Sequence, residues 1–419
     1  MSRSLLLQLA RLGDLTQSLP AISSLHSSLP DQPLDLLCAA PLTPFGKLFS
    51  SIQRVYPWEG GCWHDLATRD GGQKERLVIA AEQYMADCAF PQYTVAYNLN
   101  NHPRSIVASH LVSERVVGAG DQGPLHSSRP PWVAYLRQMA SDRGANRIHL
   151  ADAFCGVCGV NPPAVVPTIQ ATHVDLPSDL AHMVNEGSWD RIGIVLGAGD
   201  GDRRVPLATW RQFIEACIDR LPNGLCVLIG GPGEREASLA LEDQLPPSYL
   251  SRLFNCVGRT SLPQLAHVFN RCQWVVGSDT GPLHVGVACG ARAIGWYFSR
   301  ARVHETGPYG VGHYVWQYRR SADPERLDAH NINSPTQLPC SWPVIETLQL
   351  IQEQHGSENP SEWELWKSHR DEWGMFYMNG EQPDAAVLQR KNVWKRLAVP
   401  SANRYSNFSS HSLIAGCSS

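Results

Sequence analysis

Three short polar segments interrupt the apolar pattern of this sequence, and the densest is SDTGPLH, which follows an apolar run. Its proline favours the first turn of a helix. The free amides and positive dipole end of a helix start bind anions, and a glycine there lets a phosphate approach the backbone. The candidate ligands are Asp279, Thr280, Gly281 and His284. The alternative is an ordinary N-cap, in which Asp279 or Thr280 bonds the first amides of the helix.

The other two segments are glycine-rich loops, GAGDGDRRVP and GGPGERE, and each follows an apolar run. The first carries Arg203 and Arg204, whose guanidinium groups suit a diphosphate. A solvated turn is an equal alternative for Arg204. The second carries Glu234, whose carboxylate could accept hydrogen bonds from ribose hydroxyls. One such loop is weak evidence, but three in one unit predict that the arginine loop and the Asp-Thr-Gly corner converge on a single pyrophosphate.

Asp14 is the candidate general base. It stands in ARLGDLTQSLPA, directly after the first apolar run of the chain. If the site transfers a group from the pyrophosphate to a hydroxyl, that hydroxyl must lose its proton. A carboxylate held by a rigid turn can accept this proton. The alternative is a cap of the helix expected at 16–28.

These residues need a scaffold of parallel strands, and the apolar pattern predicts one. Strands are expected at 4–10, 34–40, 77–81, 94–99, 191–197, 225–229, 274–277 and 293–297. Continuous apolar strands separated by amphipathic helices are typical of parallel sheets covered on both faces. We therefore expect an α/β protein with two Rossmann-like, doubly wound domains facing across a cleft, and a ligand at the carboxyl ends of the strands.

The expected domains are an N-terminal unit at 1–170 and a nucleotide-binding unit at 188–340, joined by a proline-rich linker within 162–189. The tail at 341–419 is polar but carries tryptophans at helical spacing: Trp363, Trp366, Trp373 and Trp394. We expect a helical tail that packs back on the body and frays at its end.

Composition excludes several classes of protein. A net charge of −4 and a pI near 6.5 argue against a general nucleic-acid binder. No apolar run approaches about 20 residues, and the run at 5–9 is too short for a secretion signal, so we expect a cytoplasmic protein. The twelve cysteines are scattered through apolar segments and are expected to be reduced. Cys155 and Cys158 lack a second CxxC or a nearby His pair, so no metal site is expected.

Taken together, RLGDLTQSLPA, DRRVP, GGPGE, VGRTSLPQLAHV and SDTGPLH resemble glycosyltransferase family 9, the heptosyltransferases of bacterial lipopolysaccharide core assembly. The resemblance covers most of residues 5–317. It implies a GT-B fold and an inverting transfer without metal or other cofactor. It also implies that Asp14 is the general base, that Arg203 replaces a lysine on the donor diphosphate, and that Glu234 contacts ribose. The segment from Asp279 to His284 would hold the phosphates.

The chain departs from the family pattern in places. Ala198 and Gly199 stand where hydroxyl-bearing residues are frequent, and Val205 stands where tryptophan is usual. On the acceptor side, NLNNHPRS has fewer basic residues than lipid-core binders usually show, and His102 and Arg104 are its candidate contacts. ADP-heptose is the first-choice donor. A lipid-linked core sugar, a surface glycan and a protein side chain remain open as acceptors. A peripheral contact of the protein with the inner membrane also remains open.

Two other functions fit the same fold. A nucleotide-sugar epimerase would need carboxylates and histidines clustered around the donor sugar. A catalytically inactive binding or assembly protein would use the fold, or its tryptophan-bearing tail, to hold another molecule.

Overall fold

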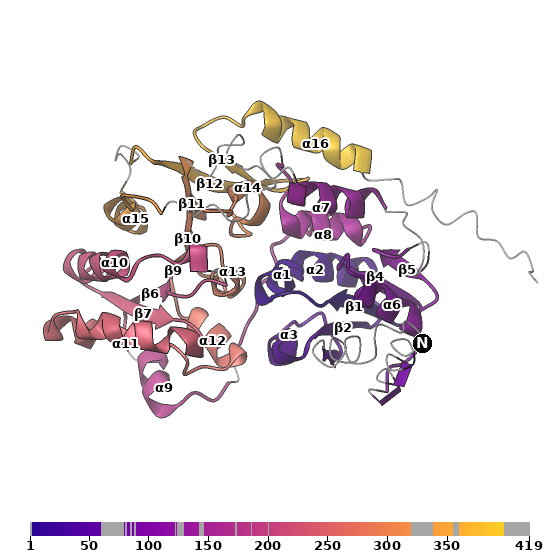
Figure 1. The fold of residues 1–419 in the computed structure, drawn as a ribbon, viewed down its shortest axis with the longest axis horizontal. Coiled ribbons are helices and arrows are strands. Elements are labelled where there is room, and N and C mark those ends of the chain that lie inside the picture. Colours follow the sequence, from indigo (N-terminus) through magenta and orange to yellow (C-terminus); the bar gives the residue numbers. More distant parts are fainter. Residues whose placement is uncertain are drawn as a thin grey trace, which may run out of the picture.

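The computed structural model describes residues 2–59, 89–121, 130–141, 146–171, 174–185, 187–199, 201–319, 338–354 and 360–397, with a few single positions between them. These residues form two sheets, each with helices packed against it, and the C-terminal segment lies across both halves (Figure 1). Among the described helices, none is long and apolar enough to cross a membrane.

The first sheet has the strand order β3-β2-β1-β4-β5 and is parallel throughout. Its strands are β1 (Ser4–Gln8), β2 (Leu34–Ala39), β3 (Val55–Trp58), β4 (Val95–Asn98) and β5 (Val116–Gly118). Alternate side chains of β1 enter two separate cores, Leu6 on one face and Leu5 and Leu7 on the other. Both faces are therefore covered, as continuous apolar strands predict. The strand expected at 77–81 lies largely outside the described residues.

The second sheet has the order β13-β12-β11-β10-β9-β6-β7-β8, and all its strands from β6 to β11 pair in parallel. These strands are β6 (Asp190–Val195), β7 (Gly224–Ile229), β8 (Leu253–Asn255), β9 (Trp274–Gly277), β10 (Arg292–Tyr297) and β11 (Tyr314–Tyr318). The helices of this half are α9 (Ser178–Asn185), α10 (Leu207–Arg220), α11 (Arg235–Asp243), α12 (Leu262–Phe269), α13 (Gly281–Ala288) and α14 (Val303–Thr306). Ile192 and Ile194 of β6 pack with Trp210 of α10, so the apolar side of α10 covers one face of this sheet.

The tail differs from the helical segment expected at 341–419. After α15 (Val344–Ile351) it forms a hairpin of β12 (Trp363–Asp371) and β13 (Gly374–Met378), which extends the second sheet with antiparallel strands, and then α16 (Ala385–Leu397). The turn explains the difference, because Gly374 has a φ of +105°, which a helix interior does not allow. Trp363 is fully buried in the second core rather than on a helix face.

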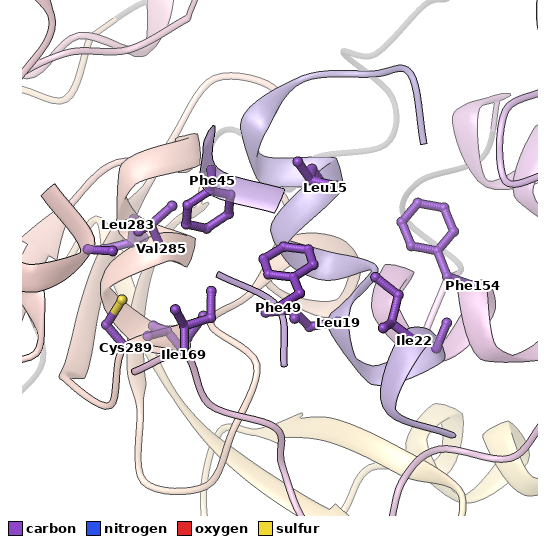
Figure 2. Close-up of a cluster of buried hydrophobic side chains, with 14 of the residues drawn as sticks. Leu15, Leu19, Ile22, Phe45, Phe49, Phe154, Ile169, Leu283, Val285 and Cys289 are labelled. Carbon is purple, nitrogen blue, oxygen red and sulfur yellow. The ribbon is translucent and has the colours of Figure 1, made fainter. Parts of the chain in front are cut away.

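The helices of the first half are α1 (Leu12–Gln17), α2 (Leu19–Ser28), α3 (Thr43–Gly46), α6 (Pro103–Val112), α7 (Pro131–Ser141) and α8 (Leu150–Val157). One apolar cluster joins several of them to the second half of the molecule. Figure 2 shows Phe45 between Leu283 of α13 and Leu15 of α1, with Phe49 beside Leu19 of α2. Burying such side chains stabilises by about 1.5–3 kcal/mol each, so this cluster holds the starts of α1 and α13 together.

Candidate active site

The starts of α1 and α13 are in near backbone contact, and they lie side by side in Figure 1. A Cβ placed on Gly281 would lie 3.2 Å from the backbone nitrogen of Gly13, and one placed on Gly13 would lie 3.4 Å from Cδ2 of His284. Since α1 follows β1 and α13 follows β9, this contact brings the carboxyl ends of the two sheets together. Glycine at both positions permits the close approach.

Arg203 and the Asp-Thr-Gly corner meet in the second half. Arg203 lies in a short turn after β6, and its Nη1 donates to the backbone oxygen of Asp279 at 2.9 Å and lies 3.4 Å from Oδ2 of Asp279. Nε2 of His284 lies 3.3 Å from Oδ1 of the same carboxylate. Burial would raise the pKa of Asp279, but the hydrogen bond from His284 and the charges of His284 and Arg203 together lower it. Asp279 therefore links the arginine loop to the start of α13.

Two polar atoms at this corner are buried without a hydrogen-bond partner among the described residues: Oγ1 of Thr280 and Nδ1 of His284. Their residues are only 7% and 4% exposed. Thr280 occupies the N-cap position of α13, yet its side chain makes no cap bond. The N-cap interpretation therefore fails for this threonine. Buried polar groups are normally paired, so two orphaned atoms beside a helix start suit the oxygens of an anion.

Glu234 and Arg204 lie on the neighbouring strand-end loops. Oε2 of Glu234 accepts from the backbone N–H of Gly231 at 2.9 Å, and Oε1 lies 3.8 Å from Nη2 of Arg204. A Cβ on Gly197 would lie 2.9 Å from the carboxyl carbon of Glu234, so the loop after β6 packs directly against this carboxylate. The Arg204 side chain is 57% exposed, and such a pair contributes little to stability.

Asp14 faces this corner from the first half. It lies in the first turn of α1, and its Oδ2 accepts from the backbone N–H of Arg11 at 3.3 Å. Burial raises its pKa most, and the charge of Asp279 adds to this, whereas the Arg11 amide and the charges of His284 and Arg11 act in the opposite direction. The expected cap of a helix at 16–28 is therefore wrong, because α1 starts at Leu12 and Asp14 bonds the N-cap amide from inside its first turn. The carboxylate also lies within electrostatic reach of Asp279 and His284.

The two acceptor-side candidates lie at the carboxyl end of β4. His102 is the N-cap of α6, because its Nδ1 accepts from the backbone N–H of Arg104 at 3.2 Å. Burial and the charge of Arg104 lower the pKa of His102. His102 therefore has a structural role as a helix cap, and the sequence alone does not distinguish this role from contact with a ligand.

Two further features of the site escaped the sequence reading. Oδ2 of Asp202 accepts from the Ser299 hydroxyl at 2.7 Å, which fastens the turn of Arg203 to the end of β10. Ser299 has a φ of +56°, a conformation that is uncommon for serine and that no local motif signals. Arg11 extends from the first half toward Gly199, a contact between distant residues that no local pattern in the sequence signals.

No group of three or more His, Cys, Asp or Glu side chains arranged to hold a metal ion occurs among the described residues. A search of the curated proteins found no match. Solved structures of several bacterial proteins do match, and they share the GT-B fold.

A glycosyltransferase of family 9 from Veillonella parvula DSM 2008 matches at 16% identity with a TM-score of 0.63, covering 84% of this chain and 98% of that one. The E. coli heptosyltransferase WaaC, with ADP-2-deoxy-2-fluoro heptose, matches at 17% identity with a TM-score of 0.58, covering 84% and 100%. The E. coli ADP-heptose lps heptosyltransferase II matches at 18% identity with a TM-score of 0.53, covering 74% and 88%. These similarities confirm the two-sheet architecture expected from the sequence.

The model of glycosyltransferase family 9 (heptosyltransferase) matches residues 92–332, which is more than half of the 419 residues. The chain therefore belongs to glycosyltransferase family 9, and it is a glycosyltransferase with the GT-B fold.

Proposed function

We propose that this protein is an inverting glycosyltransferase that moves heptose from ADP-heptose to a hydroxyl group of an acceptor. The observation that carries the proposal is the convergence of Arg203 with two buried, unpartnered atoms at the start of α13, Oγ1 of Thr280 and Nδ1 of His284, opposite Asp14. The family and the E. coli structures with ADP and an ADP-heptose analogue support the choice of donor.

The second half holds the donor. The diphosphate lies at the start of α13, where the amides after Gly281, the Thr280 hydroxyl and the Arg203 guanidinium surround it. His284, held by Asp279, presents its Nδ1 to a phosphate oxygen or to the sugar. Two residues beyond this corner complete the proposed donor site: Glu234 on the ribose hydroxyls, and Arg204 at the exposed edge.

Asp14 acts as the base. The acceptor hydroxyl gives its proton to Asp14 while its oxygen bonds to the anomeric carbon, and the bond from that carbon to the diphosphate breaks. The diphosphate leaves with the electron pair. Inversion requires the nucleophile and the leaving group on opposite faces of the sugar, which fits a base in the first half and a diphosphate in the second. A pKa raised by burial makes Asp14 a stronger base, and Arg203 stabilises the charge that develops on the leaving group.

The acceptor binds the first half, beside Asp14 and the carboxyl end of β4, where His102 and Arg104 lie. We propose a glycan, lipid-linked or protein hydroxyl as the acceptor, in the cytoplasm or at the cytoplasmic face of the inner membrane. The reaction as proposed uses no metal ion or other cofactor.

A thermal-shift screen of ADP, GDP and UDP tests the donor site. A ligand at 100 times its dissociation constant adds about 2.7 kcal/mol to stability, so ADP should give the largest shift. The shift should shrink in Arg203→Ala and persist in Arg211→Ala, whose side chain is half-exposed on α10. Equal shifts for wild type and Arg203→Ala would overturn the proposed site.

Incubation with ADP-heptose alone separates the remaining functions. A transferase releases free heptose slowly by transfer to water, an epimerase interconverts the donor, and an inactive binding protein leaves it intact. We expect slow release of heptose and ADP. An interconverted or unchanged donor would contradict the proposal.

A further inference from the structure

The loop after β6 lies against arginines from both halves of the molecule. A Cβ placed on Gly199 would lie 3.5 Å from Nη1 of Arg11 and 3.7 Å from Nη2 of Arg203. Arg11 belongs to the first half, directly before α1, whereas Arg203 belongs to the second. Two guanidinium groups therefore flank one backbone position across the domain boundary.

Each of the two arginines already lies near one carboxylate of the site. Arg203 contacts the carboxylate of Asp279, and the charge of Arg11 acts on Asp14. Like charges repel, and cations brought together from separate domains are stabilised by a group with several negative oxygens. A diphosphate is such a group, and the planar fork of arginine matches its oxygens in pairs.

The loop at Gly199 and the starts of α1 and α13 lie close to the two arginines. Gly199 has no side chain, so the two guanidinium groups can approach the loop together. The starts of α1 and α13 lie in near backbone contact beside it, and the unpartnered Thr280 hydroxyl belongs to the same corner. A diphosphate bound at α13 would therefore lie between Arg203 and Arg11.

We propose that Arg11 is a donor-binding residue supplied by the first half, and that its guanidinium binds the donor diphosphate together with Arg203. This inference rests on the proposed function of the site. The diphosphate then bridges the two halves and brings Asp14, three residues after Arg11, to the donor sugar. The sugar–phosphate bond thus breaks only where both arginines share the leaving group.

Affinities of ADP and AMP for four proteins test the inference: wild type, Arg11→Ala, Arg203→Ala and the control Arg211→Ala. Loss of a charge-assisted hydrogen bond typically weakens binding about 10- to 100-fold. We expect a loss of this size for ADP in Arg11→Ala and in Arg203→Ala, a smaller loss for AMP, and none in Arg211→Ala. The loss of ADP affinity in the double variant should differ from the product of the two single losses, because residues that share one ligand group are not additive.

The outcomes separate the inference from the proposed function. Wild-type ADP affinity in Arg11→Ala beside a weakened Arg203→Ala would overturn the role of Arg11 and leave the donor site standing. Unchanged affinity in both variants would overturn the donor site itself. If Arg11→Ala does not fold, Arg11→Lys serves instead, because it keeps the charge but loses the paired geometry. It should bind ADP more weakly than wild type, and equal binding would contradict the inference.

Discussion

Two polar junctions connect the halves of this molecule, and they differ in how their buried carboxylates are held. At the junction of α1 with α13, the Thr280 hydroxyl and Nδ1 of His284 are buried without partners among the described residues. At the junction of α8 with the tail, Asp152 is fully buried, and both its oxygens are bonded. Oδ1 accepts from the Tyr309 hydroxyl at 2.8 Å, and Oδ2 accepts from the backbone N–H of Met375 at 2.7 Å.

The two buried carboxylates also titrate differently. The pKa of Asp279 is lowered against the effect of its burial, because His284 and Arg203 stabilise the charged form. Burial raises the pKa of Asp152 to about 7, although its two hydrogen bonds and the charge of Arg390 oppose this. The surroundings of Asp152 favour its protonated form, whereas Asp279 keeps its charge beside the unpartnered Thr280 hydroxyl and Nδ1 of His284.

The largest expected effect is at Asp14. Asp14→Asn keeps the size of the side chain and an oxygen for the Arg11 amide, but it cannot accept the proton of the acceptor. We expect the rate of transfer to fall by about 10²–10⁴-fold, the usual contribution of a general base, with ADP affinity unchanged. Steady-state kinetics and calorimetry check this. Turnover near that of wild type would remove Asp14 from the mechanism.

The tail junction should respond in stability instead. Trp394 of α16 is 2% exposed, and the centroid of its ring lies 4.5 Å from the ring centroid of Trp132 of α7. Trp394→Ala should lower the free energy of unfolding by about 3–5 kcal/mol, because it leaves a cavity between the tail and the first half. Leu388→Ala, on the same helix but 53% exposed, is the matched control and should stay close to wild type in chemical denaturation. Equal effects of both changes would show that α16 does not dock as described.

Asp152 predicts a pH dependence confined to the tail junction. Its folded pKa of about 7 lies above the ordinary value of 3.8, so the folded state keeps a proton that the unfolded chain loses. The stability that this group contributes is full below pH 4 and is lost as pH rises to about 7, by on the order of 4 kcal/mol. Asp152→Asn cannot titrate. The melting temperature of wild type minus that of the variant should therefore fall between pH 4 and 7, and a constant difference would contradict the assignment.

Much of the scaffold could be predicted from the sequence because its information is local. Strands buried on both faces appear as continuous apolar runs, and the Asp-Thr-Gly segment falls at a strand-to-helix corner. The hairpin of β12 and β13 could not be predicted, since the spacing of Trp363 and Trp366 also fits a helix. The hairpin depends on the turn at Gly374, where a Cβ would overlap the carboxylate of Asp152 on α8, which is distant in the sequence.

The site shows the same division. The sequence indicates Arg203, Thr280 and His284 as candidates, but it leaves Thr280 two roles, and the segment taken alone favours the cap over the ligand. Only the tertiary structure shows that its hydroxyl makes no cap bond. The approach of Arg11 to Gly199 was beyond sequence reasoning, because it arises from the contact between two domains.

The smallest expected effect separates those two roles of Thr280. Thr280→Val removes a hydroxyl that is unpartnered in this structure and keeps the shape of the side chain. We expect ADP binding to weaken by about 5- to 30-fold, the value of one hydrogen bond of roughly 1–2 kcal/mol, with no loss of melting temperature. A lower melting temperature with unchanged ADP affinity would restore the cap interpretation.

The most direct test of the shared diphosphate site is a crystal structure with ADP bound. It should show the diphosphate at the start of α13, within hydrogen-bond distance of both the Arg203 guanidinium and the Thr280 hydroxyl. A diphosphate bound elsewhere, or one that contacts Arg203 without reaching the helix start, would contradict the account.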